Sequence, residues 1–218
     1  MLSVVIPTLN AAVHLPATLT ALGDGPGEVL VIDGGSTDGT RQAAAAHGAR
    51  VLLAPAGRGG QLATGVAAAT QPWLLLLHAD TRLGPGWAEA ATTHMREAAD
   101  RAAYFRFALD TNDPRARRLE RLVAWRCRAL AMPYGDQGLL LHRDLLRAVG
   151  GIRLLPLMED VDLIRRLGRH RLIGLDIPAT TSAAKWQHDG WYRRSARNLA
   201  CLALYLAGLP PRLIARLY

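Results

Sequence analysis

The stretch VIDGGSTDGT, residues 31–40, joins a short apolar run to a turn rich in glycine, serine and aspartate. The apolar start predicts the end of a buried strand, and Asp33 falls where this strand meets the turn. An ionised carboxylate at such a place must find a partner or lose much of its hydration. That partner comes either from the protein, through capping of the turn, or from a ligand.

Around this stretch, short apolar runs alternate with alanine-rich segments of helical spacing. The apolar runs are residues 3–6, 29–33, 51–53 and 73–78, and the helical segments are 11–22, 37–47 and 60–70. Uninterrupted apolar strands joined through helices are typical of a mostly parallel sheet covered on both faces. We therefore predict an α/β fold, a Rossmann-like doubly wound sheet with helices on both faces.

Beyond residue 100 the alternation loosens. The remaining predicted elements are a strand at 102–109, a basic helix at 114–131, a short helix beginning near Glu159, a strand at 171–177 and a C-terminal helix from about Trp191 to Ala207. Pro210 and Pro211 break the last helix.

Composition is typical of one folded domain, since half of the 218 residues are hydrophobic and 20% are charged. Cys127 and Cys201 lack the spacing of a zinc site or a disulfide framework. The formal net charge is +8, and Lys185 is the only lysine among 26 basic residues. This excess of arginine suits an anionic ligand, and a solvated surface or the base composition of the genome would explain it equally.

The chain shows neither a basic leader nor an apolar run of the ~20 residues that a membrane-spanning helix needs. Together with the lack of a disulfide framework, this predicts a cytoplasmic protein.

Polar or glycine-rich segments follow the first four predicted strands. They are PTLN at 7–10, DGGSTD at 33–38, APAGRGG at 54–60 and HADTR at 78–82. Because ligands of such sheets bind beyond the carboxyl ends of the strands, we expect these segments to form one pocket.

Four motifs occur in the order and approximate spacing of the family-2 glycosyltransferases: SVVIPTLN, VIDGGSTDGT, LLLLHADTRL and MEDVDLIRRL. Over roughly residues 3–170 the chain resembles this family of inverting enzymes of the GT-A fold. The HADT turn and the segment KWQHDGWYRRSARN resemble a small soluble branch of it. The resemblance implies metal-dependent transfer of a sugar from a nucleoside-diphosphate sugar, UDP-linked in most relatives, to an acceptor hydroxyl.

It further implies one glycosyltransferase domain over residues 1–218. We expect a nucleotide-sugar-binding half at about 1–100, an acceptor and catalytic half at about 101–185, and a helical tail at about 186–218.

In the family, the aspartate that matches Asp33 accepts a hydrogen bond from the nucleotide base, usually uracil, and an ionised carboxylate suits this task. Capping of the turn is the alternative role. The family often has a second aspartate where this chain has Gly34. Pro7, Thr8 and Asn10 resemble the first nucleotide-contacting loop, with ordinary turn chemistry as the alternative.

Two further segments resemble ligand-binding parts of the family. GRGGQ, residues 57–61, can hold a phosphate on backbone amides with Arg58 beside it, and it lacks the lysine of a P-loop. YGDQG, residues 134–138, resembles the lining of the donor-sugar or acceptor pocket. There Asp136 and Gln137 could bond sugar hydroxyls.

The HADTR turn matches the Asp-x-Asp turn that binds a divalent metal in relatives. Asp80 is therefore the predicted ligand of Mg²⁺ or Mn²⁺, which would bridge the carboxylate and the diphosphate. His78 replaces the first acid, either as a second ligand or as a core histidine. His188 could complete the site, as a late-chain histidine does in some relatives.

Glu159 and Asp160 are adjacent acids in MEDVDL. Inverting transfer needs a carboxylate that takes the proton of the acceptor hydroxyl, and the family position assigns this role to Asp160 with Glu159 beside it. A pKa raised by partial burial would suit a base. The alternative is that both acids stabilise the start of a helix.

Two other functions stay open, namely a nucleotidyltransferase acting on a sugar phosphate and a non-catalytic nucleotide-sugar-binding protein. The departures at Gly34 and His78 favour the second. Expected partners are the nucleotide sugar and an acceptor, which a lipid could carry, and no nucleic acid. The C-terminal segment, with Trp186, Trp191 and several arginines, could lie on the inner face of a membrane, pack on the core or form a homodimer contact.

Overall fold

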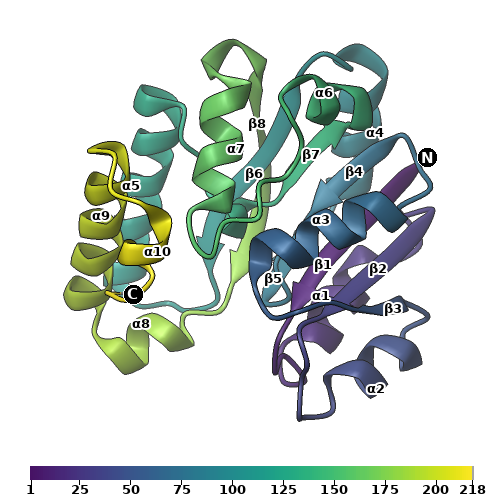
Figure 1. The fold of residues 1–218 in the computed structure, drawn as a ribbon, viewed down its shortest axis with the longest axis horizontal. Helices are drawn as coiled ribbons and strands as arrows, with labels where there is room; N and C mark the ends of the chain where they lie inside the picture. Colours follow the sequence, from purple (N-terminus) through teal and green to yellow (C-terminus); the bar gives the residue numbers. More distant parts are fainter. Residues whose placement is uncertain (218) are drawn as a thin grey trace.

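Eight strands of the computed structural model, which describes residues 1–217, form one mixed sheet in the order β3-β2-β1-β4-β7-β6-β8-β5 (Figure 1). The strands are β1 (Leu2–Thr8), β2 (Glu28–Asp33), β3 (Arg50–Leu53), β4 (Trp73–Leu76), β5 (Thr81–Leu83), β6 (Ala102–Leu109), β7 (Leu139–His142) and β8 (Leu172–Thr181). Strands β1 to β4 pair in parallel, as do β6 and β8. Strands β7 and β5 run antiparallel to their neighbours.

Helices cover both faces of this sheet. They are α1 (Leu15–Leu22), α2 (Thr40–Ala46), α3 (Arg58–Ala68), α4 (Trp87–Glu97), α5 (Pro114–Leu130), α6 (Arg143–Ala148), α7 (Glu159–Leu167), α8 (Ala184–Asp189), α9 (Trp191–Leu206) and α10 (Pro211–Ile214), with 3₁₀ turns η1 (Gly135–Gln137) and η2 (Arg169–Arg171). Successive residues of a strand face opposite sides. Thus Val4 packs with Leu19 of α1, whereas Val5 packs with Leu62 of α3. The predicted doubly wound fold is confirmed.

Beyond β6, helices α5 and α9 form a further layer (Figure 1). Val123 of α5 and Trp191 of α9 share a buried cluster with Phe107 of β6. Within residues 1–217, no helix combines the length and the apolar character that crossing a bilayer requires. The C-terminal helix thus packs on the core along one side.

Most predicted elements lie within a few residues of the observed ones, and the strand at 102–109 coincides with β6. Strand β1 extends through Thr8, because Pro7 and Thr8 pair with Ile32 and Asp33 of β2. Strand β4 ends before His78, which places this histidine in the turn that leads to β5. The segment PTLN therefore begins within β1, whereas HADTR begins beyond the end of β4.

Candidate active site

The carboxyl ends of β1, β2 and β4 lie at one edge of the sheet, because these strands are parallel neighbours. Thr8 and Asp33 pair at the ends of β1 and β2. Asp80 lies in the turn between β4 and β5. Asp33 and Asp80 are therefore at the same edge, with the end of β1 between them.

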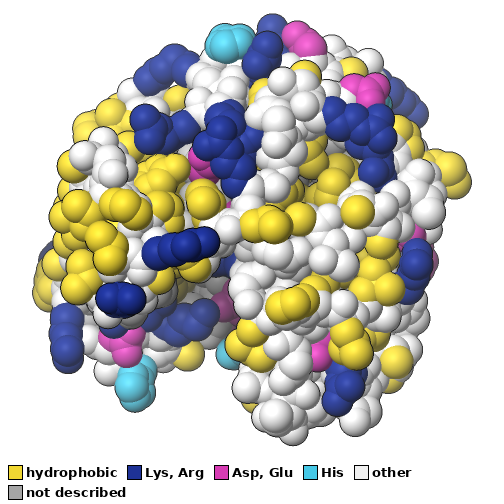
Figure 2. Space-filling view, in the orientation of Figure 1, with side chains coloured by type: hydrophobic (Ala, Val, Ile, Leu, Met, Phe, Trp, Pro, Cys, Tyr) yellow, Lys and Arg dark blue, Asp and Glu magenta, His cyan; other side chains and the backbone are white. Residues whose placement is uncertain are grey.

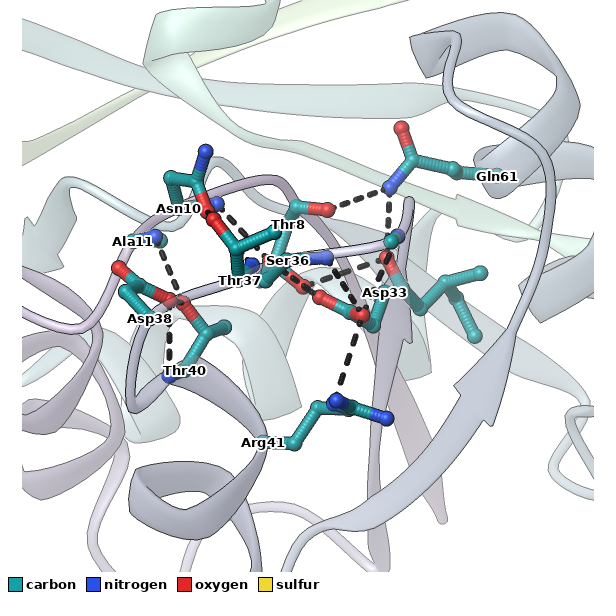
Figure 3. A network of polar contacts seen from close by, with 12 residues as sticks. Thr8, Asn10, Ala11, Asp33, Ser36, Thr37, Asp38, Thr40, Arg41 and Gln61 are labelled. Atoms are coloured by element: carbon teal, nitrogen blue, oxygen red, sulfur yellow. Dashed lines mark hydrogen bonds and ion pairs between the residues drawn. The ribbon is translucent and has the colours of Figure 1, made fainter.

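Asp33 is fully buried, and its own turn holds its carboxylate (Figure 3). Oδ2 accepts hydrogen bonds from the Gly35 and Ser36 amides at 3.2 and 3.0 Å, and Oδ1 accepts one from the Ser36 hydroxyl. The Arg41 Nε lies 3.9 Å from Oδ2. The carboxylate thus has protein partners of the kind that turn capping requires, and base recognition by Asp33 stays a prediction.

Gln61, the last residue of the GRGGQ segment, joins β1 to β2 at this edge through its side chain (Figure 3). Its Nε2 donates to the carbonyl oxygens of Thr8 and Ile32, both at 2.7 Å. A β-carbon at Gly34 would lie 3.1 Å from the same nitrogen. Glycine at position 34 therefore leaves room for Gln61, and an aspartate there would displace it.

The other three predicted nucleotide-loop residues differ in exposure. Pro7 and Thr8 are buried in β1, and Thr8 Oγ1 donates to the Ile32 carbonyl at 3.3 Å. Asn10 is exposed, has a φ of 50° and accepts a hydrogen bond from the Thr37 amide at 3.0 Å. Of the three side chains, that of Asn10 is the one open to a ligand.

A cavity of about 140 Å³ lies beside the β4–β5 turn. Its acidic and basic lining residues are Arg58, His78, Asp80, Asp136, Asp160, Lys185 and Arg194, and Asp33 is not among the lining residues. Four buried polar atoms of lining residues have no hydrogen-bond partner within residues 1–217, namely Asp136 Oδ1, Trp186 Nε1, Arg194 Nε and Asn198 Oδ1. Since buried polar atoms normally have partners, the cavity is suited to a polar ligand.

Asp80 carries the carboxylate that fits a hard cation. Its side chain is 18% exposed, and Lys185 Nζ lies 3.5 Å from Oδ2. Burial acts to raise the pKa of Asp80, but His78 and Lys185 outweigh it and the pKa lies below its ordinary value. Asp80 is thus ionised at neutral pH. One carboxylate together with substrate phosphates and water satisfies Mg²⁺, and within residues 1–217 no cluster of three His, Cys, Asp or Glu side chains forms a metal cage.

His78 faces Arg58, with Nε2 at 3.1 Å from Nη1. Burial and the Arg58 charge lower the pKa of His78 to about 4. The imidazole is therefore neutral at physiological pH, and its Nε2 accepts from the guanidinium. A metal bound to this nitrogen would have to displace Arg58.

Asp160 faces η1 from the first turn of α7. Its Oδ2 accepts a hydrogen bond from the Gly135 amide at 2.9 Å, and Oδ1 accepts one from the Val161 amide at 2.8 Å. Burial acts to raise the pKa of Asp160, but the Arg58 guanidinium and the Gly135 amide outweigh it and the pKa is lowered. The pKa of Asp160 therefore lacks the rise that would suit a base, because the Arg58 charge and the amide donors exceed the effect of burial.

Glu159 is not among the residues that line the cavity, and it forms an ion pair with Arg58. Its Oε1 is 2.5 Å from Arg58 Nε, and its side chain is 1% exposed. Burial and the neighbouring Asp160 raise the pKa of Glu159, although Arg58 opposes them. Glu159 is therefore a positioning residue for Arg58, which reaches the cavity.

The two polar residues of η1 have different surroundings. Asp136 lines the cavity, and burial raises its pKa to about 6 even though Arg126 opposes this rise. Gln137 is buried, donates to the Phe105 carbonyl at 2.9 Å and accepts from the Tyr134 amide at 3.2 Å. Both ends of its side-chain amide bond protein groups, so Gln137 does not offer the predicted contact with a sugar hydroxyl.

His188 lies away from the cavity. Its side chain is 89% exposed, and Nδ1 lies 2.9 Å from Asp189 Oδ1. The structure does not support the prediction that His188 completes a metal site, because α8 directs its side chain to solvent. The same short helix instead brings Lys185 and Trp186 to the cavity, and although their segment KWQHDGWYRRSARN is part of the family resemblance, the sequence pattern assigns neither of them to the site.

The family model of glycosyl transferase family 2 matches residues 3–155, and the chain belongs to this family. An uncharacterized glycosyltransferase of Mycobacterium tuberculosis strain H37Rv is 38% identical over 99 residues, which are 45% of this chain and 45% of that relative. The chain thus matches less than half of the length of that relative. The N-acetylglucosaminyl-diphospho-decaprenol L-rhamnosyltransferase of the same strain is 27% identical over 227 residues, covering 82% of this chain and 74% of the relative.

A solved structure has the same fold. Glucosyl-3-phosphoglycerate synthase from Mycobacterium tuberculosis, in complex with Mn²⁺ and UDP-glucose, superimposes with a TM-score of 0.65 at 20% identity. The match covers 96% of this chain and 80% of the synthase. The GT-A-like arrangement predicted from the sequence is confirmed.

Proposed function

We propose that this chain transfers a sugar from a nucleoside-diphosphate sugar to an acceptor hydroxyl, with inversion at the anomeric carbon. The observation that carries the proposal is the cavity, in which the carboxylates Asp80 and Asp160 face the cations Arg58 and Lys185. UDP is the nucleotide that we infer, supported by the UDP and UDP-glucose complexes of the structural neighbour.

The cavity residues divide the work of such a reaction. Asp80 would hold Mg²⁺ or Mn²⁺ against the diphosphate, and this cation would offset the charge on the leaving nucleotide. Arg58 and Lys185 add positive charge to the same cavity. Asp160, ionised at neutral pH, takes the proton of the acceptor hydroxyl as its oxygen attacks the anomeric carbon from the face opposite the nucleotide. The nucleoside diphosphate leaves with the electron pair of the broken bond.

Asp136 is suited to bind a sugar. Its unpartnered Oδ1 needs a hydrogen-bond donor, which a hydroxyl of the donor or acceptor sugar supplies. The nucleobase is assigned to the loops of Asn10 and Asp33, and Asn10 is the exposed member of this pair.

We infer an acceptor that is carried by a lipid. The outer helices expose large apolar side chains, namely Leu122, Trp125, Leu130, Leu199, Leu206 and Leu213. Figure 2 shows hydrophobic side chains gathered on the side of the molecule formed by α5, α9 and α10, with basic side chains beside them. Such a face fits an anionic bilayer surface. The name of the rhamnosyltransferase relative also includes a decaprenol-linked acceptor.

A donor panel tests the proposed reaction. Purified protein with Mn²⁺ should release nucleoside diphosphate from one nucleotide sugar, slowly even without acceptor. Release of pyrophosphate from a nucleoside triphosphate and a sugar phosphate would identify a nucleotidyltransferase instead. Donor binding without turnover on any acceptor would identify a non-catalytic protein, and failure of every donor to bind would overturn the proposal.

A further inference from the structure

Lys185 is the only lysine among the 26 basic residues of the chain. All the other residues of this group are arginine, so the composition of the chain does not explain a lysine at position 185. A lysine ammonium is a compact charge on a flexible stem, whereas a guanidinium is a broad planar fork. The single lysine therefore indicates a position at which a compact and mobile positive charge has a specific role.

The structure places Lys185 at the cavity. It belongs to α8, which follows β8 and lies at the lower end of the group formed by α5, α9 and α10 in Figure 1. Its Nζ lies 3.5 Å from Asp80 Oδ2, and its side chain is 63% exposed against 18% for Asp80. The lysine thus reaches the carboxylate from the open side. Its ammonium stands next to the oxygen to which the proposed function assigns a divalent cation.

An ammonium and a divalent cation beside one carboxylate repel each other. When Asp80 holds the divalent ion, Lys185 must turn away, and its flexible stem permits this. The diphosphate then offers the ammonium negatively charged oxygens at the same place, because the proposed function puts it on the same cation. An ammonium offers three donors to phosphate oxygens.

We propose that Lys185 is a diphosphate-binding residue that serves as the counter-ion of Asp80 until metal and nucleotide bind together. This inference rests on the proposed function, since it requires a nucleoside diphosphate beside Asp80. Lys185 then opposes the binding of a divalent ion alone and favours its binding together with nucleotide. The residue thereby couples metal binding to donor binding.

Calorimetry on four proteins tests this assignment. Mn²⁺ alone, and then UDP, GDP or ADP with Mn²⁺, are titrated into the wild type, Lys185→Met, Lys185→Arg and the control Arg96→Met. Methionine keeps much of the length of lysine without its charge. Arg96 is an exposed basic residue of α4 and does not line the cavity.

Lys185→Met should bind Mn²⁺ alone up to about fivefold more tightly, which is the effect of removing one exposed ion pair. It should bind the nucleotide with Mn²⁺ at least about tenfold more weakly, because a charge-assisted contact to phosphate is lost. Lys185→Arg should bind Mn²⁺ alone as the wild type does, and its loss of nucleotide affinity should be smaller than that of Lys185→Met. Arg96→Met should match the wild type in both titrations.

Unchanged affinities in Lys185→Met, or an equal loss in Arg96→Met, would overturn the assignment and leave the proposed function standing. If the wild type binds none of the nucleotides with Mn²⁺, the proposed function fails and the assignment of Lys185 fails with it. Circular dichroism monitors folding, and Lys185→Gln replaces the methionine variant if that variant misfolds.

Discussion

The Gly135 amide donates a 2.9 Å hydrogen bond to Asp160 Oδ2, and the same glycine abuts His78. A β-carbon at position 135 would lie 2.6 Å from His78 Nε2 and 3.2 Å from Asp160 Oδ2. Three segments that are distant in sequence, η1, α7 and the β4–β5 turn, therefore meet where only a hydrogen atom fits. The relative positions of the cavity side chains depend on this contact.

Gly135→Ala should consequently lower kcat by about 100-fold or more, since displacement of reacting groups by about 1 Å has effects of this size. The added carbon must push the His78 ring or the Asp160 carboxylate. Gly27→Ala is the matched control, because a β-carbon added at this exposed position before β2 would come no closer than 3.5 Å to a neighbouring atom. It should raise the free energy of unfolding by up to ~1 kcal/mol and leave kcat unchanged. Equal activity of both variants would contradict the tight contact.

Asp136→Asn should stabilise the fold at neutral pH. Burial raises the pKa of Asp136 from 3.8 to about 6, so the folded protein retains this proton more strongly than the unfolded chain does. The wild type therefore loses stability as pH rises through this interval, by on the order of 1–3 kcal/mol, and asparagine does not. Urea unfolding at pH 4 and pH 7.5 measures the change.

The stability gain of Asp136→Asn should be larger at pH 7.5 than at pH 4. Asp144→Asn serves as the control, because the Asp144 side chain is 72% exposed. A gain that is the same at both pH values would show that ionisation of Asp136 is not its cause.

Gln61→Leu should destabilise the fold by ~1–3 kcal/mol. The substitution removes two hydrogen bonds of 2.7 Å that join the Thr8 and Ile32 carbonyls, and the site is buried. Gln71→Leu, whose side-chain amide bonds the Thr70 hydroxyl at the surface, should change stability by less than about 0.5 kcal/mol. Urea midpoints that coincide for the two variants would argue against a clamp at the strand ends.

Trp125→Glu should weaken binding to vesicles that contain anionic lipid by about tenfold or more, because a large apolar side chain contributes ~1.5–3 kcal/mol when buried. Trp125 is 57% exposed in α5, on the apolar side of the molecule. Val13→Glu is the control, since Val13 is 85% exposed but lies before α1. Co-sedimentation with vesicles measures both. If the wild type does not bind vesicles and is a dimer in solution, the apolar side formed by α5, α9 and α10 would instead be a contact with a second copy of the chain.

The sequence pattern was sufficient for the fold where elements alternate regularly. Parallel strands such as β1 and β2 are continuous apolar runs, and the helices between them have clear spacing. Strand β7 was not predicted, because the short apolar run LLLH, residues 139–142, does not distinguish a buried strand from part of a helix. The antiparallel β5 has three residues and depends on its pairing with β8.

A position at the cavity was predictable where a strand end or a motif marks the residue, as for Asp80 and Asp160. Three-dimensional packing decides the rest. His188 and Lys185 lie three residues apart on α8, yet the histidine faces solvent and the lysine faces Asp80. Gln61 is a polar residue within an ordinary helical pattern, and its role depends on carbonyls of β1 and β2 that only the folded sheet brings together.

The catalytic role of Asp160 is tested most directly by donor turnover with Asp160→Asn at saturating nucleotide sugar and Mn²⁺. We expect donor affinity within about twofold of the wild type and a fall in kcat of roughly 10²–10⁴, because asparagine keeps an acceptor for the Gly135 amide but cannot take a proton. Transfer of the sugar to an acceptor at the wild-type rate, measured as release of nucleoside diphosphate, would contradict the catalytic role of Asp160.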